Sequence, residues 1–314
     1  MSPYPPRHAK HKKKKVWLWV ILLVLIVSLL IFLSYSFYLY KQVETVVATM
    51  YKPLEDSELN KSNVNRLLAD QEVINVLLLG GDERDGESVS RTDSMIFASV
   101  NPKSNQILMF SIPRDTYVEI PGYGMDKINH SYAFGQEELT IKTVENFLDV
   151  PIHFYFKINM EGFEDGVDAV GGVTVTNTFE FSYGGFEFPK GTLHLNGEEA
   201  LEFTRMRDVD PNGDFGRTSR QREVIKAMIG KVVSFESFTR INEVLSVIED
   251  NVKTNMQLSQ MKELYLSYRG ARKEIATEHI EGSGEIIDQV WYYVLTDEEV
   301  ERIRGVVKEH IQEE

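Results

Sequence analysis

The sequence contains no cysteine among its 314 residues. This absence excludes a disulfide framework, a thiol nucleophile, an iron–sulfur cluster and a thiolate zinc site. The chain also has no HExxH, P-loop or GxSxG motif, so the sequence does not indicate the chemistries that these motifs support. Its 42% hydrophobic content is nevertheless ordinary for a folded protein, and the length allows one large or two modest domains.

Acidic side chains outnumber basic ones outside the first 15 residues. The net charge is −14, although residues 1–15 hold six basic side chains and no acidic one. The remainder is therefore still more acidic than the whole, and such a body repels nucleic-acid phosphates. We expect no nucleic-acid partner, and a DNA-binding regulator ranks last among the functions considered.

Long apolar runs are also few, and one stands out. Residues 16–40 contain no formal charge and exceed the roughly 20 residues that span a bilayer. Aromatic residues stand near both ends, and the lysine run precedes the segment, which predicts a cytoplasmic N-terminus and an outer body at the cell membrane. A cleaved signal peptide, with Val46-Val47-Ala48 as a weak cleavage site, and a buried core helix are the alternatives.

The chain thus divides into four predicted parts. These are a basic cytoplasmic tail (1–15), a transmembrane helix (16–40), a juxtamembrane linker (41–73) and an extracytoplasmic domain (74–314).

Short apolar runs at 74–79, 95–100 and 107–111 predict three strands of the outer domain. The short link between the second and third strands implies an antiparallel pair. If the first and second strands are also neighbours, joined by the loop 80–94, the end of the first, the start of the second and the end of the third share one edge. Further strands are expected at 153–158 and 172–176, with helices at 126–134, 136–148, from Asn196 to about 205, and from about Thr218. The mixture predicts a layered α/β domain.

Charged residues gather at the predicted edge, namely Asp82, Arg84, Arg91, Asp93, Arg114 and Asp115. Paired carboxylates such as Asp82 and Asp93 are suitable ligands for Mg²⁺, and Arg114 can hold a phosphate through its bidentate guanidinium. The alternatives are turn aspartates that bond only local backbone, and surface ion pairs of little energetic value.

A second basic cluster lies between Arg205 and Arg222. Arginine recurs there five times without a lysine, in an otherwise acidic body, which favours planar bidentate donors over a merely solvated surface. Arg217 and Gln221 are four positions apart and would share one helix face. Interleaved aspartates, including Asp214, leave ordinary ion pairing as the alternative.

The ordered motifs resemble those of the LytR-CpsA-Psr family of mostly Gram-positive bacteria, close to the wall teichoic acid ligases of bacilli. The segments that carry this resemblance, beside those above, are Asp126-Lys127-Ile128-Asn129-His130, residues 167–173 and residues 194–201. It implies an α/β/α sandwich with a central mixed sheet and an apolar pocket for a polyprenyl chain. It also implies transfer of a glycopolymer from undecaprenyl pyrophosphate to a muramic-acid hydroxyl of peptidoglycan.

Matched motif by motif, the resemblance makes Asp82 and Asp93 the Mg²⁺ ligands. The pyrophosphate-binding candidates are Arg84, Arg91, Arg114, Arg205, Arg207, Arg217 and Gln221. Arg114, Asp115 and Asp214 are the catalytic candidates, the two aspartates as possible bases. Five phenylalanines are candidates for the lipid pocket or for ordinary core: Phe97, Phe110, Phe154, Phe156 and Phe163. A polyprenyl-pyrophosphate hydrolase and a non-catalytic lipid- or glycan-binding envelope regulator remain alternatives.

Overall fold

The computed structural model describes residues 12–54, 61–81, 92–231, 245–247, 249 and 251–313. Contacts divide the chain into two units, Met1–Thr45 and Val46–Glu314. In the described part of the chain, α1 (Lys12–Met50) is the one helix long and apolar enough to cross a membrane. Its apolar side chains from Val16 to Tyr40 are largely exposed, as expected of a helix that contacts lipid rather than a protein core.

The second unit begins within α1, since Val46, Val47 and Met50 are buried. It thus starts earlier in the chain than residue 74. Among the residues described for this unit, other helices include α2 (Lys61–Ala69), α3 (His130–Leu148), α4 (Met160–Ala169), α5 (Gly197–Arg205), α6 (Asp214–Lys231), α9 (Leu258–Ser267), the 3-10 helix η1 (Ala271–Lys273) and α10 (Asp297–Gln312).

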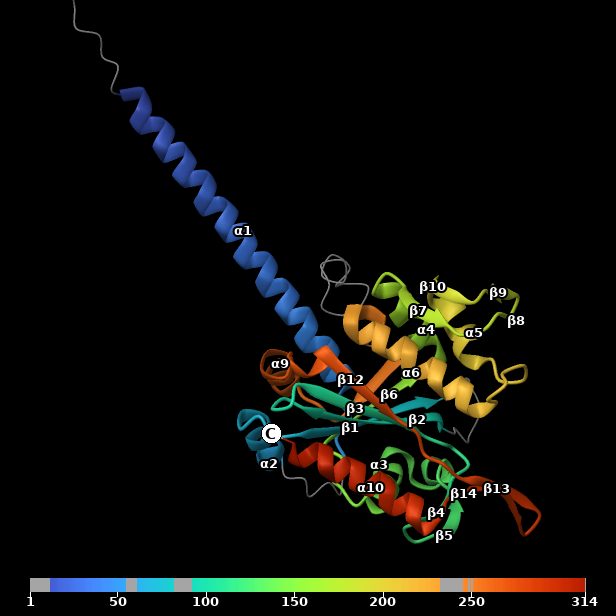
Figure 1. Ribbon diagram of the computed structural model, residues 1–314. Coiled ribbons are helices and arrows are strands. Elements are labelled where there is room, and N and C mark those ends of the chain that lie inside the picture. The colour runs from blue at the N-terminus through green and yellow to red at the C-terminus, as the bar shows by residue number, and fades with distance from the viewer. Residues whose placement is uncertain are drawn as a thin grey trace, which may run out of the picture. The chain divides into compact units, whose positions relative to one another are not determined.

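A central mixed sheet of six strands organises this unit (Figure 1). In spatial order its strands are β11 (Val252–Thr254), β6 (Phe154–Asn159), β1 (Ile74–Gly81), β2 (Thr92–Asn101), β3 (Gln106–Ile112) and β12 (Glu274–Glu278). The β1–β2, β2–β3 and β11–β6 pairs are antiparallel, whereas β1–β6 and β3–β12 are parallel. The predicted α/β/α sandwich with a mixed sheet is confirmed.

Alternate residues of the strands serve the two faces of the sheet. Leu77 and Phe97 lie on one face, in a core that includes residues of α3 and α10. Leu78 and Ile96 lie on the other face, where Ile225 of α6 packs. Figure 1 shows α3 and α10 on one side of the sheet and α6 on the other.

A smaller lobe continues from α4 and carries its own apolar cluster. It contains the short hairpins β7 (Val173–Asn177) with β10 (Gly191–Leu195) and β8 (Phe181–Tyr183) with β9 (Phe186–Phe188). Phe188 and Phe203 pack together in this cluster. Asn196 caps α5 with the predicted side-chain bond, reinforced by Glu199 in a capping box.

Two helix predictions need correction. The segment 126–134 is not helical from its start, because Asp126 and Lys127 belong to β5 (Gly124–Lys127), which pairs with β4 (Tyr117–Ile120). Helix α3 begins only at His130, and its kink at Gly135 and Gln136 matches the predicted break. Helix α6 begins at Asp214, a turn before the predicted start near Thr218, so part of the predicted loop 208–216 is helical.

Candidate functional site

The predicted edge of the sheet exists and carries an ion pair. Gly81 at the end of β1 pairs with Thr92, and Met95 in β2 pairs with Ile112 at the end of β3. Arg114, two residues past β3, therefore reaches Asp93 in β2, with 2.5 Å between Nη1 and Oδ1. Burial lowers the pKa of Arg114, but Asp93, Asp115 and Asp214 together raise it above its ordinary value.

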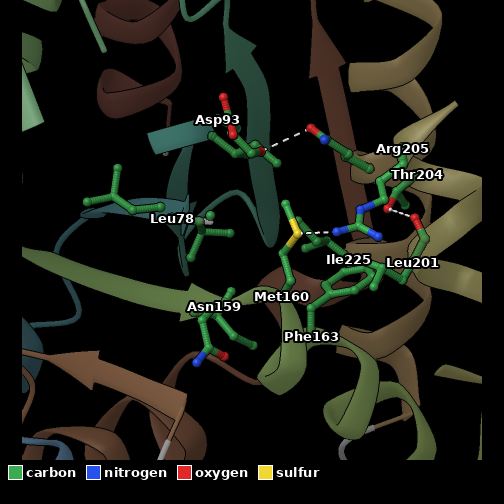
Figure 2. Close-up of a pocket in the computed structure, with 16 residues that line it drawn as sticks. Leu78, Asp93, Asn159, Met160, Phe163, Leu201, Thr204, Arg205 and Ile225 are labelled. Atoms are coloured by element: carbon green, nitrogen blue, oxygen red, sulfur yellow. Dashed lines mark hydrogen bonds between the residues drawn. The ribbon is translucent and has the colours of Figure 1, made fainter. Parts of the chain in front are cut away.

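An apolar pocket opens next to this ion pair. We call it the inner pocket, and its cavity volume is about 120 Å³. Its walls come from the sheet and from α4, α5 and α6, and the main apolar side chains are those of Leu78, Ile96, Ile158, Met160, Phe163, Leu201 and Ile225. Figure 2 shows Leu78, Met160, Phe163, Leu201 and Ile225 around the cavity, together with Asp93 and Arg205. The space suits a hydrocarbon chain.

Six polar side chains also line the inner pocket: Asp93, Ser94, Asn159, Thr204, Arg205 and Gln221. Gln221 accepts a hydrogen bond from Ser94 Oγ at 3.0 Å, which ties α6 to β2. Arg205, in the last turn of α5, pairs with Glu202 at 2.9 Å and also donates to the sulfur of Met160. The apolar walls of the pocket thus end at Arg205 and Gln221, whose side chains can bind an anion.

A second depression, which we call the side groove, is lined by Arg114 itself. Its charged lining consists of Arg114, Asp115, Arg207 and Asp214. Asp115 pairs with Lys127 at 2.7 Å and lies 3.5 Å from Arg114 Nε. The remaining lining residues are Pro113, Asn212, Phe215, Thr218, Gly282, Gly284, Trp291 and Tyr293.

Arg217 interacts electrostatically with charged residues of both depressions. Its Nη2 bonds Asp214 Oδ1 at 2.6 Å, and its side chain is only 12% exposed. Burial lowers the pKa of Arg217; the nearby Asp214 opposes this, while Arg114 and Arg207 lower it further. A buried guanidinium next to two others gains from a bound anion, so the cluster has the electrostatics of a phosphate site.

The connection between α5 and α6 is fixed by a residue whose role the sequence did not indicate. Arg220 is buried, pairs with Asp210, and donates to the carbonyls of Phe203 and Met206. Asp210 also accepts from the backbone N–H of Asn212. Arg220 therefore shapes the loop that carries Arg207 and sets the start of α6, rather than facing either depression.

Most predicted site residues come together. The structure gathers Asp93, Arg114, Asp115, Arg205, Arg207, Asp214, Arg217 and Gln221 around the two depressions. Asp82, Arg84 and Arg91 lie outside the described residues. Sequence reasoning missed Ser94, which positions Gln221, and the aromatic residues Trp291 and Tyr293.

The five phenylalanines have different positions. Phe97, Phe110 and Phe154 are fully buried in apolar cores. Phe156 is partly buried and packs against the core that contains Phe154. Phe163 alone among the five lines the inner pocket.

The donor set is compatible with a hard cation. Asp93 presents a carboxylate beside the pocket mouth, and Asp82 directly follows Gly81, a lining residue of the same pocket. Within the residues that the structure describes, no group of three or more His, Asp or Glu side chains is arranged to hold a metal. Mg²⁺ commonly takes one or two protein carboxylates and completes its shell with substrate phosphates, so this sparse set fits it.

The chain is similar in sequence to proteins named as transferases. The sequence profile of the LytR_cpsA_psr family matches residues 37–309. The polyisoprenyl-teichoic acid–peptidoglycan teichoic acid transferase TagU of Oceanobacillus iheyensis is 46% identical over 286 residues, which cover 88% of this chain and 89% of that protein.

Solved structures agree with the sequence match. The crystal structure of Bacillus subtilis TagU has a TM-score of 0.62 at 43% identity and covers 77% of this chain and 98% of that one. A structure of TagT bound to LIIa-WTA has a TM-score of 0.70 at 30% identity, with 83% and 99% coverage.

Proposed function

The chain belongs to the LytR-CpsA-Psr family, and from this premise we propose that it is a glycopolymer–peptidoglycan phosphotransferase. In this proposal it moves a wall teichoic acid from undecaprenyl pyrophosphate to a muramic-acid hydroxyl of peptidoglycan. The substrates named for its transferase relatives, teichoic acid and peptidoglycan, support the choice.

One observation carries the proposal: an apolar pocket lies directly beside a cluster of guanidinium groups. A polyprenyl pyrophosphate has the same two parts in the same order, a hydrocarbon chain joined to a diphosphate. The inner pocket would hold the chain near Leu78, Phe163 and Ile225. Arg205 and Gln221 would then meet the diphosphate where the apolar walls end.

The proposed reaction is a phosphoryl transfer that needs no ATP, since the pyrophosphate is already activated. A sugar hydroxyl forms a bond to the glycan-linked phosphorus, and the bond to the bridging oxygen breaks, so that polyprenyl phosphate leaves. Arg114, Arg207 and Arg217 would neutralise charge on the phosphate oxygens. Catalysis of this kind is mostly positioning and electrostatic stabilisation.

Asp115 and Asp214 are the candidates to accept the hydroxyl proton, because both line the side groove. Asp115 is held by Lys127 and Arg114, and Asp214 by Arg217. A loose transition state has little need for a strong base, so an ion-paired carboxylate is sufficient.

Asp93, together with Asp82, would hold Mg²⁺ if the metal is used. The bound ion would supply further neutralisation of the diphosphate charge. Asp93 would still position Arg114 through their ion pair.

The proposal places the catalytic unit outside the cytoplasmic membrane, with α1 as a single-pass anchor and the basic N-terminal tail in the cytoplasm. The excess of lysine before the apolar segment supports this orientation. Lipid-linked donor and peptidoglycan would then both be within reach of the outer domain.

The test is a reaction of the purified full chain with a lipid-pyrophosphate-linked glycan, peptidoglycan oligomers and Mg²⁺. A phosphodiester-linked glycan–peptidoglycan product is expected. Release of free phosphorylated glycan instead would favour a hydrolase. Donor binding without either product would favour a non-catalytic envelope regulator.

A further inference from the structure

The side groove contains an aromatic element that the proposed phosphate chemistry does not use. Strands β13 (Ser283–Ile287) and β14 (Val290–Val294) form a hairpin, and Trp291 and Tyr293 of β14 line the groove. Phe215 of α6 lies across from them, with its ring centroid 5.7 Å from that of Tyr293. Trp291 and Phe215 are 48% and 42% exposed.

We propose that the side groove binds sugar rings of the acceptor glycan, with Trp291 as the surface on which a ring stacks. This inference rests on the proposed function and names the acceptor site of the same reaction. Sugar rings have an apolar C–H face and a rim of hydroxyls. A half-exposed indole next to carboxylates and guanidinium groups matches both features.

The position of the groove follows from the geometry of the reaction. In phosphoryl transfer the attacking and leaving oxygens lie roughly in line with the phosphorus. The leaving polyprenyl phosphate belongs to the inner pocket in the proposed function, so the attacking hydroxyl must arrive from the opposite side. Arg114 pairs with Asp93, which lines the inner pocket, and itself lines the side groove, which therefore begins where the acceptor is required.

The groove offers both donors and acceptors of hydrogen bonds. The guanidinium groups of Arg114 and Arg207 and the carboxylates of Asp115 and Asp214 line it together. Sugar hydroxyl groups can donate to the carboxylates and accept from the guanidinium groups.

Contacts with Gly284 and Lys127 fix the position of the Trp291 indole. Gly284 lies under the indole, and a Cβ at this position would come within 2.7 Å of Trp291 Nε1 and 3.0 Å of Cζ2. Lys127, which pairs with Asp115, has its Nζ 5.9 Å from the Trp291 ring centroid. A glycine therefore allows the ring to lie close against the opposite strand.

Backbone contacts also connect the hairpin to the turn that bears Arg114 and Asp115. The backbone N–H of Tyr293 donates to the carbonyl oxygen of Asp115 at 2.9 Å, and Thr116 forms a β-bridge with Tyr293. The stacking surface and the turn that bears Arg114 thus hold a fixed relation, as a site for positioning a nucleophile requires.

Trp291 is the only tryptophan of the sequence outside the apolar segment, so its fluorescence offers a direct test. The full chain in detergent is titrated with uncrosslinked peptidoglycan glycan oligomers and, separately, with the lipid-linked donor. We expect Trp291→Ala, which lacks the reporting indole and is therefore titrated by calorimetry, to weaken glycan-oligomer binding roughly tenfold while donor affinity stays constant. Gly284→Ala should act in the same direction by displacing the indole.

Trp291→Phe keeps an aromatic surface without the indole, so it should retain most of the affinity by calorimetry but lose the glycan-induced fluorescence change. Tyr265→Ala, which removes an exposed aromatic ring on α9, is the matched control and should change neither affinity. Melting temperatures verify that each variant is folded.

Unchanged glycan-oligomer affinity in Trp291→Ala would overturn the inference, and so would a loss of donor affinity alone, which would assign the groove to the donor glycan. Failure of the proposed function is distinguishable, because the binding titrations do not need turnover. If Trp291→Ala loses oligomer binding and the wild type yields no glycan–peptidoglycan product, glycan binding by the groove is supported and the proposed transfer reaction is contradicted.

Discussion

Arg114 and Asp93 are 21 positions apart in the sequence, yet their side chains meet at 2.5 Å where the ends of two strands share one edge of the sheet. Asp93 lines the inner pocket and Arg114 lines the side groove, so this ion pair forms the boundary between the two depressions. The pair links the expected position of the lipid chain to the expected position of the acceptor.

Replacing Arg114 should reduce transfer without unfolding the domain. We expect Arg114→Ala to lower kcat by roughly 10²–10³, because one donor to the phosphate oxygens is lost. Arg114→Lys should recover only part of this loss, since lysine lacks the bidentate fork. Product formation at saturating donor measures the effect. Lys103→Ala, which breaks an exposed pair with Glu72, is the control and should retain full activity.

Narrowing the inner pocket should discriminate between donors by chain length. Leu201 lines the pocket from α5, and Leu201→Trp would occupy space that the hydrocarbon needs. We expect KM to rise for a long-chain donor and to change less for a short-chain one, measured with two donors that carry the same glycan. Equal changes for both donors would speak against a lipid role of this pocket.

Removing divalent cation should suppress the reaction if Asp93 contributes to a Mg²⁺ site. Chelation is expected to lower transfer, and added Mg²⁺ to restore it. Asp93→Asn should raise the Mg²⁺ concentration needed for half-maximal activity. Full activity in chelator would exclude the metal from the proposal.

The buried pair of Arg220 and Asp210 should matter for stability. The side chains are 9% and 1% exposed, and Arg220→Leu would leave the Asp210 carboxylate buried without its cation. The expected loss is about 3 kcal/mol in the free energy of unfolding, measured by urea denaturation. Lys308→Leu breaks an exposed pair with Asp149 and should cost less than about 1 kcal/mol.

His153 should make stability depend on pH. Burial lowers its pKa to about 4, and its Nδ1 accepts a hydrogen bond from the backbone N–H of Asn75. The unfolded chain binds this proton near pH 6.5 and the folded one only near 4. Stability from this group is therefore present above pH 6.5 and is lost as the pH falls to about 4, by roughly 3 kcal/mol.

Urea denaturation at pH 7 and pH 4.5 measures this slope. His153→Asn should be less stable at pH 7 and should show a shallower fall over the same range. An identical fall in the variant would assign the pH dependence to other groups.

Much of the fold could be predicted from short-range patterns. The apolar runs beginning at Ile74 and at 95 and 107 predicted β1, β2 and β3. The short link between the last two, with the first two taken as neighbours, predicted the edge that joins Asp93 to Arg114. The start of α3 could not be predicted in this way. Residues 126–127 pair with β4, and this tertiary pairing overrides the local helical pattern.

Some residues of the candidate site could be predicted because one residue type recurs in a short segment of the sequence. Others could not, because their roles depend on tertiary packing. Arginines without lysine between 205 and 222 indicated an anion site, but nothing local separates Arg220, which is structural, from Arg217, which faces the cluster. Trp291 comes from a distant hairpin, and tertiary contacts such as the bond from Tyr293 to Asp115 and the β-bridge between Tyr293 and Thr116 bring it to the turn that bears Arg114.

Both outermost strands of the central sheet, β11 and β12, come from the last quarter of the chain. Because synthesis begins at the N-terminus, β1, β2, β3 and β6 are all made before either border strand exists. Through that interval the half-built sheet exposes two rows of unsatisfied backbone donors and acceptors, which invite pairing with other chains. A polypeptide shortened to residue 231 would keep nearly every recognisable motif and still be prone to aggregate.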